Sequence, residues 1–226
     1  MIERVLEPEA MDSVDEAREY DLMDHVSVNA AFVADLLAAV GRVRGSLLHD
    51  GFVVDVGTGT ARIPIALCDQ DPKCRGVAVD LAEEMLRVGR RNVSEAGLAG
   101  RVSLQRARVT ALPFCDACAP VLMSNSLIHH VPDPAAALAE MCRVVSPGGV
   151  VFVRDLFRPA SASDLDRLVR VHAAAATPAQ RQLFADSLHA ALTLDEVRAI
   201  IRTLPFSSAS VEASSDRHWT VSARRA

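Results

Sequence analysis

Residues 53–63 read VVDVGTGTARI, and this stretch decides the fold. Three valines and an aspartate form a short run, as expected of a strand that is buried on both faces of a parallel sheet. Gly57-Thr58-Gly59 then predicts a tight turn, and an apolar pattern with helical spacing follows it. A strand, a glycine turn and a helix start are together typical of a nucleotide site.

The chain beyond this stretch alternates between strand and helix patterns. Strands are predicted at 52–56, 76–80, 102–106, 121–125 and 150–155. The intervening helices are predicted after the glycine turn through Cys68, at 82–96 and at 134–145. Strands that alternate with helices of this length indicate parallel crossovers, and therefore a doubly wound α/β sheet. Capping-box patterns at Ser13, Thr177 and Thr193 predict three further helices, and the last twenty residues predict a hairpin around Ser214.

Composition limits the classes of partner and location. The 226 residues are half hydrophobic and carry a formal charge of −5, without a basic stripe that would follow nucleic-acid phosphates. The opening MIERVLEPEAMD has no apolar signal region, and no run approaches the roughly 18 apolar residues of a membrane helix. Five cysteines do not form a disulfide framework in a chain of this size. We therefore expect a cytoplasmic protein with no membrane span and no nucleic-acid partner.

Two familiar phosphate-binding interpretations of the glycine turn fail. A P-loop requires Gly-x-x-x-x-Gly-Lys-Ser/Thr, and no lysine is present here. A dinucleotide fold requires Gly-x-Gly-x-x-Gly, so that the backbone can approach a pyrophosphate, but the sixth position counted from Gly57 is Arg62. Asp55, which lies beside the turn, would repel a diphosphate and would attract an ammonium group.

A second aspartate completes the description of the ligand. Asp80 ends the predicted strand GVAVD, about 20 residues after the turn, where an acid accepts hydrogen bonds from both hydroxyls of an adenosine ribose. Gly57 and Gly59 would let the backbone approach an amino-acid tail. A ligand with a cationic amino-acid end, a ribose and no phosphate is S-adenosylmethionine (SAM).

Five motifs then resemble one family in order and spacing. VVDVGTGTARI, GVAVDLAEEML, TALPF, SNSLIHHVPDP and EMCRVVSPGGVVFVRD resemble the class I SAM-dependent methyltransferases, and especially the small-molecule branch similar to the enzymes of ubiquinone and menaquinone biosynthesis. The resemblance is strong over residues 50–158, whereas the flanking segments resemble the family only in being helical. It implies a Rossmann-like, seven-stranded, mostly parallel sheet with an antiparallel last strand, and a SAM site at the C-terminal ends of the first strands.

The resemblance also implies roles for individual residues. The methionine part of SAM would contact Asp55, Gly57, Thr58 and Gly59, and the ribose would contact Asp80. The residues implied around the adenine and the sulfonium are Leu81, Met85, Arg108, Val109, Asn125 and Ser126.

Arg108 departs from the family pattern. Relatives usually carry an acid at this position, which accepts a hydrogen bond from the adenine amino group, whereas arginine has donors only. The guanidinium could stack on the adenine, or it could pair with Asp116 while the Val109 backbone N–H holds the adenine. We favour the pairing. A second usual acid is replaced by Ala119-Pro120, which we interpret as a structural loss.

Three residues are candidates for the chemistry. His129 follows the fourth predicted strand, and histidine titrates near neutral pH. Tyr20 belongs to a helix that covers the cofactor in relatives, and Asp155 ends the fifth predicted strand, where an ion pair with Arg154 or Arg158 is an equally open interpretation. His130 is expected to pack under the loop. No cluster has metal-ligand spacing, so we expect no metal site.

The sequence thus predicts one class I methyltransferase domain over residues 1–226. Its expected parts are an N-terminal helical lid at 1–45, a SAM-binding core at 46–158, a helical cap at 159–205 and a C-terminal hairpin at 206–226. The expected activity is methyl transfer by in-line displacement from SAM, which leaves S-adenosyl-L-homocysteine (SAH), to a small molecule, in a monomer or homodimer. The alternative is a protein that binds SAM or SAH without transferring a methyl group and acts as a sensor or partner subunit.

Overall fold

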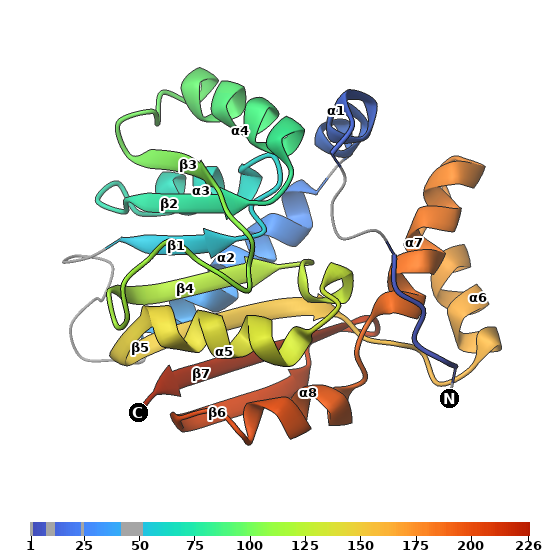
Figure 1. The fold of residues 1–226 in the computed structure, drawn as a ribbon. Helices are drawn as coiled ribbons and strands as arrows, with labels where there is room; N and C mark the ends of the chain where they lie inside the picture. Colours follow the sequence, from blue (N-terminus) through green and yellow to red (C-terminus); the bar gives the residue numbers. More distant parts are fainter. Residues whose placement is uncertain (1, 8–11, 24, 42–51) are drawn as a thin grey trace.

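Seven strands form one sheet in the order β3-β2-β1-β4-β5-β7-β6, with helices on both faces (Figure 1). The structure is a computed structural model that describes residues 2–7, 12–23, 25–41 and 52–226. The strands are β1 (Val53–Val56), β2 (Gly76–Asp80), β3 (Val102–Arg106), β4 (Ala119–Asn125), β5 (Val145–Leu156), β6 (Phe206–Ala213) and β7 (His218–Arg225).

The topology of the sheet creates a ligand crevice beside β1. Strands β1 to β5 pair in parallel, while β7 is antiparallel to both β5 and β6. The chain moves outward from β1 to β2 and β3 and then returns to the other side of β1 as β4, so the strand order reverses between β1 and β4. Open α/β sheets bind their ligands beyond the C-terminal ends of the strands at such a reversal. The predicted sheet with an antiparallel last strand is confirmed.

Helices cover the two faces and the C-terminal edge of the parallel strands. The helices are α1 (Val14–Leu22), α2 (Val26–Gly41), α3 (Arg62–Gln70), α4 (Glu83–Glu95), the short 3-10 helix η1 (Ile128–His130), α5 (Pro134–Val144), α6 (Ala162–His172), α7 (Pro178–Ala190) and α8 (Leu194–Ile201). All three predicted capping boxes form, with Ser13, Thr177 and Thr193 accepting hydrogen bonds from backbone N–H groups. Helices α1, α6 and α7 lie beyond the strand ends that form the crevice (Figure 1).

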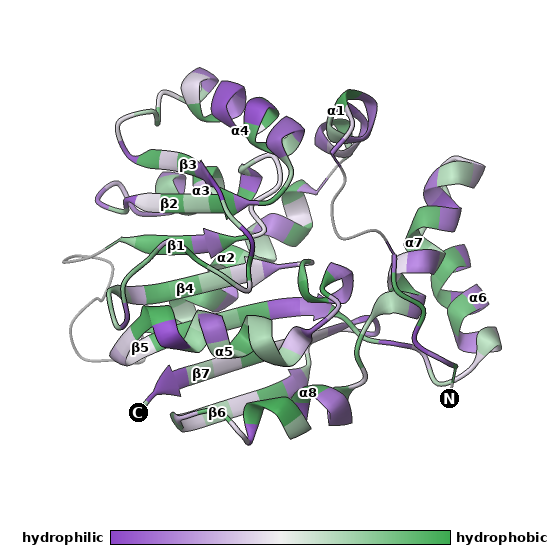
Figure 2. Ribbon diagram, viewed as in Figure 1, coloured by the Kyte–Doolittle hydropathy of each residue, from purple (hydrophilic) through white to green (hydrophobic). Residues whose placement is uncertain are grey.

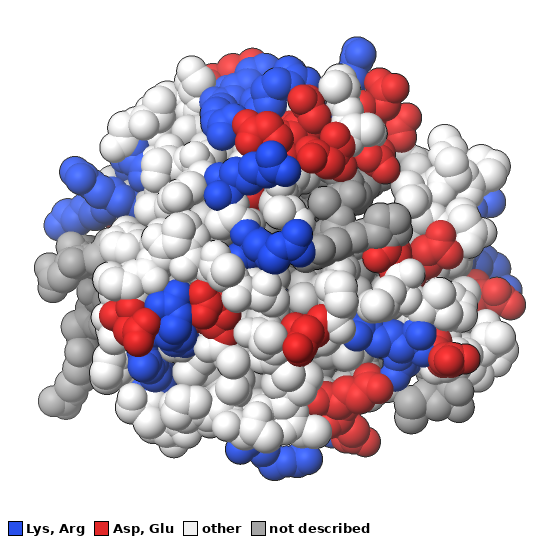
Figure 3. All heavy atoms as spheres, viewed as in Figure 1, with Lys and Arg blue, Asp and Glu red and all other residues white. Residues whose placement is uncertain are grey.

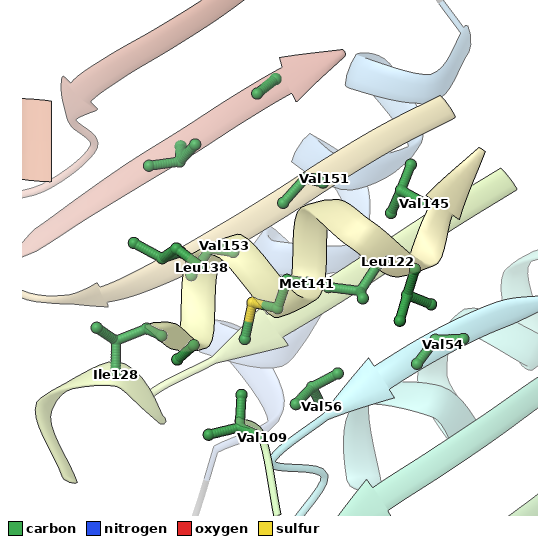
Figure 4. Close-up of a cluster of buried hydrophobic side chains, with 14 of the residues drawn as sticks. Val54, Val56, Val109, Leu122, Ile128, Leu138, Met141, Val145, Val151 and Val153 are labelled. Carbon is green, nitrogen blue, oxygen red and sulfur yellow. The ribbon is translucent and has the colours of Figure 1, made fainter. Parts of the chain in front are cut away.

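The alternation of side chains along the strands divides the core between the two faces. Val54 and Val56 of β1 pack with Leu138 and Met141 of α5 (Figure 4). Val53, one residue away, instead belongs to the cluster that contains α2 and α3. Both faces of β1 are therefore buried, which explains its uninterrupted apolar sequence, and green ribbon dominates the centre of the sheet in Figure 2.

The starts of β4 and β5 differ most from the sequence prediction. Strand β5 begins at Val145, although the sequence predicted 150, because the Pro147-Gly148-Gly149 segment is accommodated by a shift of register between β4 and β5. Gly149 packs so closely on this bulge that an added Cβ would lie 2.7 Å from the Pro120 carbonyl oxygen. Strand β4 correspondingly begins at Ala119. Residues 42–51, between α2 and β1, lie outside the described residues.

Among the described residues, no single helix has the length and apolar composition needed to cross a membrane, and α1 and α2 meet that criterion only when taken together across a break bent by 79°.

Candidate active site

The glycine turn after β1 has the backbone geometry that the sequence predicted. Gly57 and Gly59 have positive φ angles of 74° and 54°, a conformation that disfavours side chains. A Cβ at Gly57 would also lie only 2.9 Å from Leu127, the residue before η1. The Gly57 and Thr58 N–H groups donate to the Val79 carbonyl of β2 at 2.8 and 3.0 Å, which fixes the turn against the neighbouring strand.

Asp80 holds this turn from the end of β2. Its carboxylate accepts from the Gly59 N–H at 2.7 Å and from the Ala82 N–H at 3.0 Å. Each carboxylate oxygen has a second lone pair, so two ribose hydroxyls can still be accepted. Asp80 also lines a cavity of about 30 Å³ together with Leu81 and Val109, which we call the small cavity. The ribose and adenine contacts of these three residues stay predictions.

Asp55 is a buried carboxylate beside the turn. Its side chain is 3 % exposed, and Oδ2 has no hydrogen-bond partner within the part of the chain that the structure describes. Burial, together with the nearby Asp80 charge, raises the pKa of Asp55 to about 7. A buried carboxylate is stabilised by an opposite charge, so the position suits the ammonium group of an amino-acid ligand.

A larger cavity of about 400 Å³ opens between the glycine turn and the N-terminal helices. It is lined by Gly57 and Thr58, by Asn125 at the end of β4, and by residues of α1, α2 and α3. We call it the large cavity. Because Gly57 borders both cavities, one ligand could extend from one to the other across the turn.

Helix α1 covers the large cavity and is tied to the core through Asp21. The Asp21 carboxylate, whose side chain is 7 % exposed, accepts from Arg62 of α3 at 3.0 Å and from Asn92 of α4 at 2.8 Å. Arg91 adds a contact at 3.3 Å. These donors lower the pKa of Asp21 against the effect of burial. The sequence analysis missed this contact because residues 41 and 71 positions apart carry no shared local pattern.

Tyr20, next to Asp21, faces the large cavity. Its ring lies against Gly59, where an added Cβ would be 3.5 Å from the tyrosine Cε1. Burial and the nearby carboxylates of Asp80 and Asp55 raise the pKa of Tyr20 to about 12. The phenol therefore stays protonated near neutral pH and can donate a hydrogen bond, but it is a poor general base.

The residues implied around the adenine divide into buried and exposed groups. Val109 is buried in the small cavity wall, while Met85 is buried against α1 and does not line that cavity. The Arg108 side chain is exposed and does not line the small cavity either. The favoured pairing of Arg108 with Asp116 is wrong, because Asp116 pairs with Arg143 at 2.6 Å.

The residues after β4 occupy the adjacent part of the crevice. Asn125 lines the large cavity, as a residue near the sulfonium should. Ser126 has a positive φ of 55°, and its N–H donates to the Arg154 carbonyl of β5 at 2.9 Å. Ser126 lines neither cavity, so its cofactor role stays a prediction.

His129 and Asp155 form a buried pair at the ends of η1 and β5. The His129 Nδ1 lies 2.5 Å from Asp155 Oδ1, and the two side chains are 4 % and 1 % exposed. The Asp155 carboxylate raises the pKa of His129 although burial opposes this shift. The open ion-pair interpretation of Asp155 is wrong, because Arg154 pairs with Asp35 and Arg158 with Glu196. Neither His129 nor Asp155 lines the two cavities, so a role as general base is not favoured.

Charges on the visible face do not form a single-sign surface. Acidic and basic side chains are interspersed over α1 and α4 (Figure 3), and Arg87, Arg90 and Arg91 of α4 each pair with a nearby acid.

Comparison with protein families identifies the central part of the chain. Residues 53–149, which include the glycine turn, Asp80 and η1, match the methyltransferase domain family. A ubiquinone/menaquinone biosynthesis C-methyltransferase of Geobacter sulfurreducens is 34% identical over 112 residues, which cover 49% of this chain and 44% of the relative. The corresponding protein of Francisella philomiragia is 28% identical over 147 residues, covering 63% and 57%. The chain thus spans about half the length of these curated relatives.

Solved structures share the fold over nearly the whole chain. A SAM-dependent methyltransferase of Aquifex aeolicus superimposes with a TM-score of 0.70 at 18% identity, covering 95% of this chain and 99% of the other. An O-methyltransferase family 2 protein of Planctomyces limnophilus, solved with apigenin, gives a TM-score of 0.67 at 19% identity, covering 96% and 63%. At this identity the likeness establishes the fold alone.

The pKa of Asp55 predicts how cofactor affinity depends on pH. An ammonium group binds the ionised carboxylate, and a pKa of about 7 leaves Asp55 mostly protonated at pH 6. The ionised fraction grows from about a tenth at pH 6 to about three quarters at pH 7.5, so SAM affinity should rise about eightfold over this interval. Calorimetry at the two pH values measures the change. Asp55→Asn should bind weakly with little pH dependence, and an equal rise in this variant would assign the effect to another group.

The Asp21 contacts predict that α1 contributes to cofactor binding. Asp21→Ala removes the acceptor that joins α1 to α3 and α4, and we expect SAM binding to weaken by about 1–2 kcal/mol, below the full value of a charge-assisted bond because the arginines are half exposed. Glu19→Ala changes an exposed acid on the same helix and is the matched control. Calorimetry measures both variants. Equal affinities in wild type and Asp21→Ala would contradict a covering role for α1.

Proposed function

We propose that the chain, whose residues 53–149 match the methyltransferase domain family, is a class I SAM-dependent methyltransferase of the branch similar to the ubiquinone and menaquinone enzymes. In this proposal it transfers a methyl group from SAM to a small molecule in the large cavity. The observation that carries the proposal is the Asp55 carboxylate, which is buried beside a glycine turn and has an oxygen without a partner among the described residues. A buried acid in that state calls for a cation.

The residues present offer SAM complementary groups along the crevice. Asp55, which lines neither named cavity, would neutralise its ammonium group from β1, and Asp80 would accept from the ribose hydroxyls. Leu81 and Val109 would border the adenine, and the small cavity of about 30 Å³ has to widen to admit it. When bound, SAM supplies a methyl group that is already activated by the sulfonium. The protein then contributes mainly by positioning, which can lower a barrier by ~7–11 kcal/mol when the reacting atoms are aligned.

The lining of the large cavity favours an acceptor that is partly apolar. Met23, Val26, Ile63 and Ala66 supply apolar surface, while the protonated phenol of Tyr20 and the amide of Asn125 can orient a polar group. Tyr20 would act as a hydrogen-bond donor, since the high pKa of its phenol disfavours proton abstraction. This lining does not select the atom that is methylated, but the names of the relatives make intermediates of ubiquinone and menaquinone biosynthesis the first acceptors to test.

Turnover of labelled SAM tests this function. We expect calorimetric binding of SAM and SAH but not of NAD, and transfer of label into a small-molecule extract or a quinone-precursor panel. Asp80→Ala should weaken SAM by ~1.5–3 kcal/mol, the usual loss for hydrogen bonds to a charged group. Tight SAM binding without label transfer would favour the sensor or partner-subunit alternative, and NAD binding with no SAM binding would overturn the proposal.

The exposed Arg108 predicts an adenine pocket that lacks one acceptor. Arg108→Asp would restore a carboxylate for the adenine amino group, and we expect SAM to bind about tenfold more tightly, the lower end of the range for one charge-assisted bond. Arg108→Ala removes the guanidinium without adding an acceptor and should leave affinity nearly unchanged. Calorimetry compares the three proteins. Weaker binding in both variants would mean that Arg108 itself contacts the cofactor.

A further inference from the structure

A second cluster of functional groups lies beside η1, outside both cavities. It joins Glu7 of the N-terminal segment to His129 and His130 of η1. The Glu7 Oε1 atom lies 3.6 Å from His129 Nε2 and 3.7 Å from His130 Nδ1. One ligand-type atom from each residue falls within 4.8 Å of the others. The two histidines lie 122 and 123 positions after Glu7 in the sequence, so no spacing motif could reveal the cluster.

The distances in the cluster exceed those of hydrogen bonds. An N–H···O bond spans ~2.7–3.2 Å, so Glu7 Oε1 is too far from either imidazole to be a good acceptor. This oxygen is buried and has no hydrogen-bond partner among the described residues. Two ligands of a tetrahedral ion with bonds of ~2.0–2.1 Å lie about 3.3–3.4 Å apart, so the two distances from Glu7 to the histidines exceed this separation by only a few tenths of an ångström.

Asp155 prepares His129 to bind a metal. When the imidazole is neutral and its Nδ1–H is donated to Asp155 at 2.5 Å, the Nε2 atom that faces Glu7 has a lone pair for a metal ion. The backbone N–H groups of His129 and Leu156 donate to the same carboxylate at 3.1 and 2.6 Å and fix its position. A carboxylate behind a histidine is the usual arrangement that sets the tautomer of a metal-binding imidazole.

Glu7 is positioned by contacts that do not involve the two histidines' rings. The Arg4 guanidinium donates to the Ala190 and Val131 carbonyls at 2.7 and 3.1 Å, and the Val5 N–H donates to the His189 carbonyl at 3.2 Å. These bonds lay the N-terminal segment along η1 and α7. The Glu7 and His130 side chains are 11 % and 18 % exposed, so an ion can enter from their side.

We propose that Glu7, His129 and His130 bind a divalent transition-metal ion of the Zn²⁺ class, with Asp155 as a positioning residue behind His129. Two imidazoles and one carboxylate suit such ions, whereas Mg²⁺ prefers oxygen ligands and retains its waters. Three protein ligands leave a fourth position open to water or to another ligand. The bound ion fastens the N-terminal segment to the carboxyl end of the sheet, six residues before the cap of α1 at Ser13.

Zinc titration of the full-length protein, first stripped with a chelator, tests the site. Thiols also bind Zn²⁺, so Cys115→Ser and Cys118→Ser form the common background. We expect one equivalent of Zn²⁺ by calorimetry, and Co²⁺ to give visible d–d absorption of a low-coordinate site. Glu7→Gln, which keeps shape and removes the anionic ligand, should weaken Zn²⁺ at least about tenfold, and Asp155→Asn should weaken it by about 10- to 100-fold.

Glu3→Gln is the matched control, since it makes the same change at an exposed position of the same segment. It should bind Zn²⁺ as the background protein does, and circular dichroism should show both glutamine variants folded. Equal Zn²⁺ affinity in the Glu7→Gln and Glu3→Gln proteins would overturn the proposal. An absence of Zn²⁺ binding would also overturn it. NMR that showed His129 protonated at both nitrogens would then identify the cluster as an ion pair. Equal binding of Mg²⁺ would also contradict a transition-metal site.

Discussion

The Asp80 carboxylate joins the end of β2 to the glycine turn after β1, and the remainder of the site depends on this contact. It accepts from Gly59 N–H at 2.7 Å and Ala82 N–H at 3.0 Å. The turn is therefore fixed in its positive-φ form, α4 begins at a defined place, and the crevice between β1 and β4 stays open. A ligand that reaches this edge of the sheet meets donors and acceptors already in position, which reduces the ordering cost of binding.

The burial of Asp80 near Asp55 is electrostatically unfavourable, and a cationic ligand can relieve this effect. Burial raises the pKa of both the Asp55 and the Asp80 carboxyls, and the Asp80 charge further disfavours ionisation of Asp55. Tyr20 is held neutral for the same reason, since its phenol faces both acids. A site with two buried acids and an uncharged phenol is electrostatically incomplete until a cation enters. This property favours a cationic ligand over a phosphate, which agrees with the exclusion of phosphate-binding motifs from the sequence.

Sequence patterns predicted what local forces determine and missed what distant contacts determine. The strands Gly76–Asp80 and Val102–Arg106 form at the predicted boundaries, and Ser13, Thr177 and Thr193 cap their helices, because apolar period and capping chemistry act within a few residues. The partner of Asp116 was predicted wrongly, because Arg143 and Arg108 are equally suitable in sequence and only the fold selects between them. The cluster around Glu7 was missed for the same reason, since η1 meets the N-terminal segment only in the folded chain.

The site combines residues of the matched domain with residues that precede it in the chain. The matched family domain covers residues 53–149, yet Tyr20 and Asp21, which border the large cavity, and Glu7, which meets η1, all precede it. The core thus supplies the glycine turn, Asp55 and Asp80, while the preceding residues cover the large cavity and reach the ends of β4 and β5. The covering of the large cavity and the η1 cluster therefore both depend on residues that precede the matched domain, which explains why a description of the core alone leaves the site incomplete.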